Sequence, residues 1–128
     1  MRKIIAVLCG IATGTFATAA LADDVRVTST YLYGEYLTFQ VNYGSPCNGS
    51  GETRISAVSC NSAEPFTCSI EIYRIGEWGP MCDAARYEEV YDSLNNLGLG
   101  KPQYKGKEIS LWVYGSGGGS SLETIKIP

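Results

Sequence analysis

The stretch DAARYEEVYDSLNNLG, residues 83–98, decides which fold the sequence predicts. Pro80 precedes the stretch, Asp83 can cap a helix N-terminus, and Gly98 stands where a helix needs a left-handed cap. A strand over residues 87–91 is the alternative, but the pair Glu88-Glu89 breaks its alternation. We therefore expect an amphipathic helix, because apolar side chains recur at spacings of three and four residues: Ala84, Tyr87, Val90, Tyr91, Leu94 and Leu97.

Strand patterns lie on both sides of this predicted helix. Gly34-Glu35 is expected to mark a bend or bulge within the first strand region, and residues 115–121 form a glycine-rich hairpin turn. The order is therefore three strands, one helix and two strands. We predict a β-rich α+β domain, a small five-stranded OB-like barrel with one helix between strands 3 and 4. The segments with strand character are 25–29, 36–43, 53–60, 66–74, 107–114 and 122–127.

The N-terminal segment resembles a secretory signal peptide. Arg2 and Lys3 form a basic region, residues 4–20 are mostly apolar, and Ala20-Leu21-Ala22 is an A-x-A cleavage site. Cleavage after Ala22 would leave residues 23–128 as a single globular domain of 106 residues in the periplasm or outside the cell. No later stretch is long and apolar enough for a transmembrane segment.

Four cysteines remain after cleavage: Cys47, Cys60, Cys68 and Cys82. An even number in a small exported domain indicates two disulfides, and a zinc site would need closer cysteine pairs or histidines. Three pairings are possible. Cys60 and Cys68 flank a short loop and could join a hairpin, which would leave Cys47 to pair with Cys82.

The composition argues against an enzyme and against a cofactor. There is no histidine, so the commonest general base and the commonest metal ligand are both missing. The chain has 10 basic and 13 acidic side chains, and loss of Arg2 and Lys3 leaves 8 and 13, a net charge of −5. An acidic domain without a basic run is not expected to bind nucleic acid.

The C-terminal half resembles the B subunits of bacterial A/B-pentamer toxins of the cholera, Shiga and pertussis type. Three stretches carry the resemblance: the predicted helix 83–94, the strand 108–113, and the glycine-rich turn with the final strand, 115–127. The resemblance implies an OB-fold, a homopentamer, a toxic A subunit as partner, and a host glycan or glycoprotein receptor. It also implies a sugar-stacking role for Trp112.

A second resemblance rests on the cysteine spacing Cys47-x12-Cys60-x7-Cys68-x13-Cys82. With Tyr33-Gly34-Glu35 upstream and Arg86-Tyr87 downstream, the chain is similar to the rhamnose/galactose-binding lectin domain of the sea-urchin-egg type. This resemblance requires a strand where the first requires a helix. Both imply carbohydrate binding without chemistry.

Sugar sites combine an aromatic platform with polar side chains at the sugar hydroxyls. An aromatic side chain in a glycine-flanked loop, such as Trp78, is harder to explain as core than one in a strand. Trp112 is expected to point away from the face formed by Ile109, Leu111 and Val113. The candidate glycan-binding residues are Trp78, Trp112, Tyr31, Tyr33 and Glu35.

Three functions follow as hypotheses. The first is a receptor-binding toxin B subunit in a homopentameric ring. The second is a monomeric secreted lectin-like module. The third is an exported inhibitor or immunity protein against a cell-wall hydrolase, with the loop from Trp78 to Met81 placed in the cleft of the enzyme.

Overall fold

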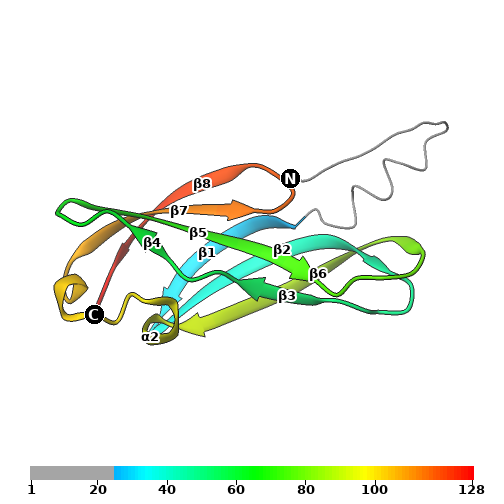
Figure 1. Ribbon diagram of the computed structural model, residues 1–128, viewed down its shortest axis with the longest axis horizontal. Coiled ribbons are helices and arrows are strands. Elements are labelled where there is room, and N and C mark those ends of the chain that lie inside the picture. Colours follow the sequence, from blue (N-terminus) through cyan, green and yellow to red (C-terminus); the bar gives the residue numbers. More distant parts are fainter. Residues whose placement is uncertain (1–24) are drawn as a thin grey trace.

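Alternation of apolar and polar side chains extends through most of the chain and builds two β-sheets that pack face to face (Figure 1). The computed structural model describes residues 25–128, apart from the side chain of Asp83, so the predicted signal peptide 1–22 lies outside the described residues. The first sheet has the order β1-β2-β6, and the second has the order β3-β5-β7-β8 with β4 also paired to β5. The strands are β1 (Arg26–Tyr33), β2 (Tyr36–Pro46), β3 (Glu52–Ile55), β4 (Ser59–Cys60), β5 (Phe66–Ile75), β6 (Met81–Ser93), β7 (Glu108–Gly115) and β8 (Ser120–Lys126).

The predicted helix over residues 83–94 is wrong, because this segment is the strand β6. It pairs antiparallel with β2 along most of its length, with Phe39 opposite Val90 and Thr38 opposite Tyr91. Tyr87 and Tyr91 are four residues apart, a spacing that places two side chains on one face of a helix and also on one face of a strand. Tertiary pairing therefore overrides the helical pattern.

Helical structure in the described residues is limited to two short segments after β6, α2 (Leu94–Leu97) and the 3₁₀ turn η1 (Pro102–Tyr104). The hydroxyl of Ser93 accepts a hydrogen bond from the Asn96 amide (3.1 Å) and caps the start of α2. Gly98 adopts the left-handed conformation at the end of α2, with φ of 94°. The predicted C-cap at Gly98 is thus confirmed, although the helix it ends is only one turn long.

The structure does not support the predicted five-stranded OB-like barrel. The two sheets remain open, and β5 pairs parallel with β7. The bend expected at Gly34-Glu35 is instead the turn of a hairpin between β1 and β2, where Gly34 has a positive φ of 60°. The coarser prediction, a β-rich domain with two disulfides, is confirmed.

The core lies between the two sheets and is closed at one end by the segment after β6. Alternate residues of β2 and of β5, β7 and β8 point inward, as their sequence patterns predict. Each of these strands therefore presents its remaining side chains on the outer face of its sheet. The largest fully buried side chains include Leu37, Phe39, Ile70, Ile72, Leu97, Leu99, Ile109 and Leu111.

The cysteines pair in the way suggested by the short loop between Cys60 and Cys68. Cys60 on β4 is directly opposite Cys68 on β5, and the two are joined. Cys47 is joined to Cys82 across 35 residues of chain, at the end of the molecule that carries the β5–β6 loop. The first bridge fastens the short strand β4 to its sheet, and the second connects the segment after β2 to the start of β6.

Candidate functional site

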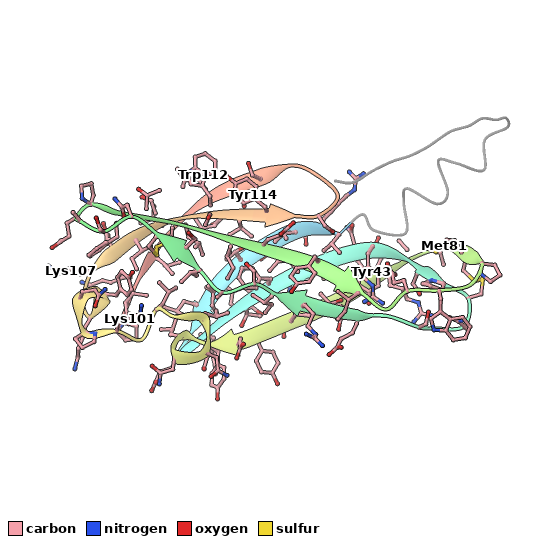
Figure 2. All side chains as sticks on the ribbon, in the orientation of Figure 1. Tyr43, Met81, Lys101, Lys107, Trp112 and Tyr114 are labelled. Carbon is pink, nitrogen blue, oxygen red and sulfur yellow. A yellow bond between two sulfur atoms is a disulfide. The ribbon has the colours of Figure 1, made fainter. Side chains whose placement is uncertain are left out.

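The structure places the five predicted site residues in three separate regions. Trp112 lies on β7, on the outer face of the second sheet, and it projects away from the sandwich in Figure 2. Tyr31 and Tyr33 lie on β1 and Glu35 in the turn after it, in the first sheet. Trp78 lies in the loop between β5 and β6. The predicted residues therefore do not form one common site.

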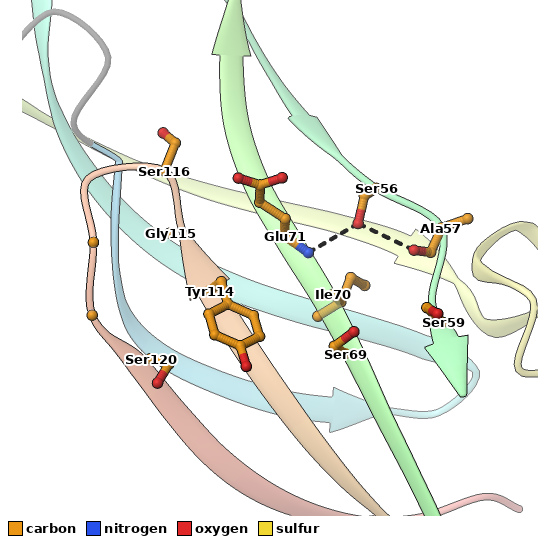
Figure 3. A pocket seen from close by; sticks show the side chains of 12 residues that line it. Ser56, Ala57, Ser59, Ser69, Ile70, Glu71, Tyr114, Gly115, Ser116 and Ser120 are labelled. Atoms are coloured by element: carbon orange, nitrogen blue, oxygen red, sulfur yellow. Dashed lines mark hydrogen bonds between the residues drawn. The ribbon is translucent and has the colours of Figure 1, made fainter. Parts of the chain in front are cut away.

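A shallow groove with a cavity volume of about 590 Å³ lies on the outer face of the second sheet (Figure 3). Its floor comes from β5, one side from the segment that links β3 to β4, and the other from the turn between β7 and β8. The parallel pairing of β5 with β7 brings Glu71 opposite Tyr114 and so places both at the groove. The lining residues are mostly serines and glycines, with Tyr114 as the aromatic residue and Glu71 as the charged one.

Some polar groups of the groove are engaged within the protein and several are available. The Ser116 hydroxyl accepts a hydrogen bond from the Val25 amide (3.4 Å). The Ser56 hydroxyl accepts a hydrogen bond from the Glu71 amide (2.9 Å) and donates one to the Ala57 carbonyl (3.1 Å), as the dashed lines in Figure 3 show. Within residues 25–128, no hydrogen bond is formed by the side chains of Ser59, Ser69 or Glu71. These hydroxyls and this carboxylate can bind the hydroxyl groups of a ligand.

Aromatic side chains extend the groove along the outer face of β7. Tyr114 is 42 % exposed and Trp112, two residues earlier on the same face, is 37 % exposed. Trp112 is in register with Ser69 on one side and with Leu122 on the other. The outward orientation predicted for Trp112 is confirmed, and it places an apolar platform beside a row of hydroxyls.

The outer face of the first sheet carries a second group of aromatic residues. The Tyr31 hydroxyl donates a hydrogen bond to the Glu89 carboxylate, which raises the pKa of Tyr31 above its ordinary value. The rings of Tyr36 and Tyr91 meet edge to face, with centroids 5.8 Å apart. Thr38, in register with Tyr31 and Tyr91, is buried although it lies on this outer face. We call these residues the tyrosine face: Tyr31, Tyr33, Tyr36, Tyr87 and Tyr91.

Three members of the tyrosine face are missed by the sequence prediction. Tyr87 and Tyr91 belong to the apolar stripe of the predicted helix, yet they are 80 % and 63 % exposed on β6. The sequence pattern predicts Tyr36 only as the first residue of the strand 36–43. The separation of four residues between Tyr87 and Tyr91, interpreted with a period of two, would have placed them on one face of a strand.

The described residues form no arrangement that could bind a metal ion. In residues 25–128, no three side chains of Cys, Asp or Glu are grouped closely enough to hold a metal. None of the helices in these residues has the length and apolar character that a membrane span requires.

Comparison with known proteins gives no further indication of function. No family model, no curated protein and no solved structure matches this chain.

Proposed function

We propose that this chain is an exported, non-enzymatic glycan-binding protein, and that the groove between β5 and the β7–β8 turn holds the sugar. The observation that supports the proposal is the aromatic platform of Trp112 and Tyr114 beside a groove lined with hydroxyls. A sugar ring presents an apolar C–H face to an aromatic ring and its hydroxyls to polar side chains, so both features have a partner on the ligand.

The charge of the groove favours a neutral glycan. Glu71 is the charged residue of the lining, and no lysine or arginine contributes to it. A sialylated or uronic-acid-containing sugar would bring a second negative charge close to this carboxylate, which is unfavourable. We therefore expect neutral or amino sugars to bind and acidic sugars to be rejected.

A lectin-like module fits this site more simply than a toxin ring does. The homopentamer and its A subunit are implied by the resemblance to toxin B subunits, one part of which is a helix at residues 83–94, and residues 83–93 instead belong to the strand β6. The glycan groove needs only one copy of the chain. The ring stays a prediction, and the native mass of the purified protein distinguishes it from a monomer.

A glycan array followed by calorimetric titration tests the site. We expect Trp112→Ala and Tyr114→Ala each to weaken binding of a neutral glycan by about tenfold, because each removes part of the platform. Tyr87→Ala is the control, since it removes an even more exposed ring from the other sheet and should leave affinity unchanged. Glu71→Gln should extend binding to sialylated forms of the same glycan.

Two results would contradict this proposal. One is that the protein binds no glycan, even when the glycan is available to it at millimolar concentration. The other is a bound glycan whose affinity falls with Tyr87→Ala but not with Trp112→Ala or Tyr114→Ala, which would move the site to the tyrosine face.

A further inference from the structure

The loop that joins β5 to β6 presents an exposed tryptophan at one end of the sandwich. Trp78 is 69 % exposed, and in Figure 2 its neighbour Met81 lies at the opposite end of the molecule from Lys107. An indole is one of the largest apolar groups a protein can leave in water, so a single one on a loop is a candidate contact residue.

The backbone of Trp78 is held on both sides by one short segment of chain. Its amide donates to the hydroxyl of Ser50 (3.0 Å), and its carbonyl accepts from the same hydroxyl (2.9 Å) and from the Asn48 side-chain amide (3.1 Å). The Asn48 side chain is itself fixed, because its Oδ1 atom accepts a hydrogen bond from the backbone amide of Ser50 (2.9 Å). The residue that carries the indole is therefore tied to a second loop by three hydrogen bonds.

The base of the loop is also held in place, by a disulfide, a backbone hydrogen bond and a buried ion pair. The disulfide between Cys47 and Cys82 joins the segment after β2 to the start of β6, and the Cys47 amide donates to the Pro80 carbonyl (2.8 Å). On the other side, the Arg74 guanidinium contacts the Glu77 carboxylate at 3.0 Å, with both side chains less than 10 % exposed. A loop held in this way loses little conformational entropy when its exposed side chain is bound.

The charge around the indole indicates what kind of surface it can meet. Gly76, Gly79 and Pro80 flank Trp78 without any charge, and the carboxylate of Glu77 lies buried beside Arg74. A lipid surface is normally bound through lysine and arginine next to the inserted aromatic residue, and this loop has none exposed. A rigidly held indole with uncharged neighbours is instead suited to an apolar pocket with a polar rim on another protein, as at the hot spots of protein–protein interfaces.

We propose that Trp78 is the anchor of a protein-binding surface, and that its indole enters an apolar pocket of a partner protein. This surface is separate from the glycan groove and does not depend on it. Ser50 and Asn48 act as positioning residues, because they hold the backbone of Trp78 and leave its side chain free to be buried.

The test begins with capture and ends with a purified pair. The immobilised protein is exposed to the extracytoplasmic proteins of its source, in parallel with Trp78→Ala and Trp112→Ala variants. A protein retained by the Trp112→Ala variant but not by Trp78→Ala is purified and titrated. We expect Trp78→Ala to weaken its binding by at least about 30-fold. We expect Ser50→Ala to weaken it by about 3- to 10-fold, because the intact indole must then be ordered on binding.

Fluorescence gives a readout that is independent of capture. In the Trp112→Phe variant, Trp78 is the sole tryptophan of the chain, so its emission should shift to the blue and resist acrylamide quenching when the partner is added. Unfolding midpoints of the variants verify that each is folded. The same variant is mixed with vesicles of phosphatidylcholine, with and without phosphatidylglycerol.

Three outcomes would overturn the proposal. The first is that no protein is retained in a Trp78-dependent way. The second is a purified partner that binds the Trp78→Ala variant as tightly as the unaltered protein, or leaves Trp78 open to acrylamide. The third is a blue shift with vesicles alone, which would assign the indole to a lipid surface.

Discussion

The Arg74 side chain links the two sheets and the β5–β6 loop through hydrogen bonds, an ion pair and a cation–π contact. Its guanidinium bonds the Thr53 hydroxyl (2.7 Å) and the Glu77 carboxylate (3.0 Å), and it lies over the ring of Tyr43 at 3.9 Å. The Tyr43 hydroxyl donates to Glu88 (2.9 Å), which brings a second carboxylate, carried by β6, into the cluster. Burial, with this hydrogen bond to Glu88, raises the pKa of Tyr43 above its ordinary value.

Removal of this guanidinium should be strongly destabilising. We expect Arg74→Ala to lower the free energy of unfolding by about 3–5 kcal/mol, because it takes the cation away from the buried Glu77 carboxylate. Arg54→Ala is the control: Arg54 lies on the neighbouring strand and pairs with Glu52, but both side chains are largely exposed, so its loss should cost less than about 1 kcal/mol. Urea unfolding at neutral pH measures both, and equal losses would show that the Arg74 cluster is not a buried ion pair.

Among the elements, β6 shows what a pattern of apolar residues can and cannot decide. The adjacent glutamates Glu88 and Glu89 would argue against a strand only if both had to lie in the same environment. In β6 they lie on opposite faces of the sheet. Glu88 lies on the side of β6 that faces the second sheet, where it is 40 % exposed and accepts hydrogen bonds from Tyr43 and Thr53, whereas Glu89 lies on the outer face and accepts one from Tyr31. A charged residue is tolerated on the inner side because partners from other strands are present, and those partners are invisible in the local sequence.

Paired substitutions on β6 separate the strand from the helix that the sequence predicts. Val90 packs against the core and Tyr87 is exposed, although both belong to the apolar stripe of the predicted helix. We expect Val90→Asp to cost at least about 2 kcal/mol, because it places a carboxylate against apolar side chains. Tyr87→Asp should cost about 1 kcal/mol or less. Thermal or urea unfolding in which both variants lose similar stability would favour the helix.

The site was predictable where it depends on one strand and not where it depends on several. Alternation within β7 was sufficient to point Trp112 outward, since a strand has only two faces. The groove needs the segment after β3 and the β7–β8 turn to meet over β5, and that meeting follows from the parallel pairing of β5 with β7. The order of the strands in the sequence does not determine which of them pair, so the sequence does not predict the groove.

At the scale of the whole molecule, contacts between distant parts of the chain hold the sandwich together. β2 pairs with β6 and β5 pairs with β7, so each sheet joins strands that are separated by other elements. The cysteine count predicted the two bridges because it depends only on composition and compartment. Their consequences differ, since one closes a loop of 8 residues of separation and the other a loop of 35.

The longer bridge should contribute more stability than the shorter one. In the chain-entropy description, the Cys47–Cys82 loop is worth about 4 kcal/mol and the Cys60–Cys68 loop about 2.5 kcal/mol, because the longer loop restricts the unfolded chain more. Cys68 is also buried in the core, so replacing it would add a loss of packing to the loss of the bridge.

Two single-disulfide variants, each with the other cysteine pair replaced by alanine, separate these effects. Each variant is unfolded in urea with its remaining bridge oxidised and then reduced, so that the packing of its own side chains stays the same. We expect reduction of Cys47–Cys82 to lower the free energy of unfolding by about 1 kcal/mol more than reduction of Cys60–Cys68. An equal or larger loss from Cys60–Cys68 would mean that the short bridge acts on the folded state, by holding β4 against β5, rather than on the unfolded chain.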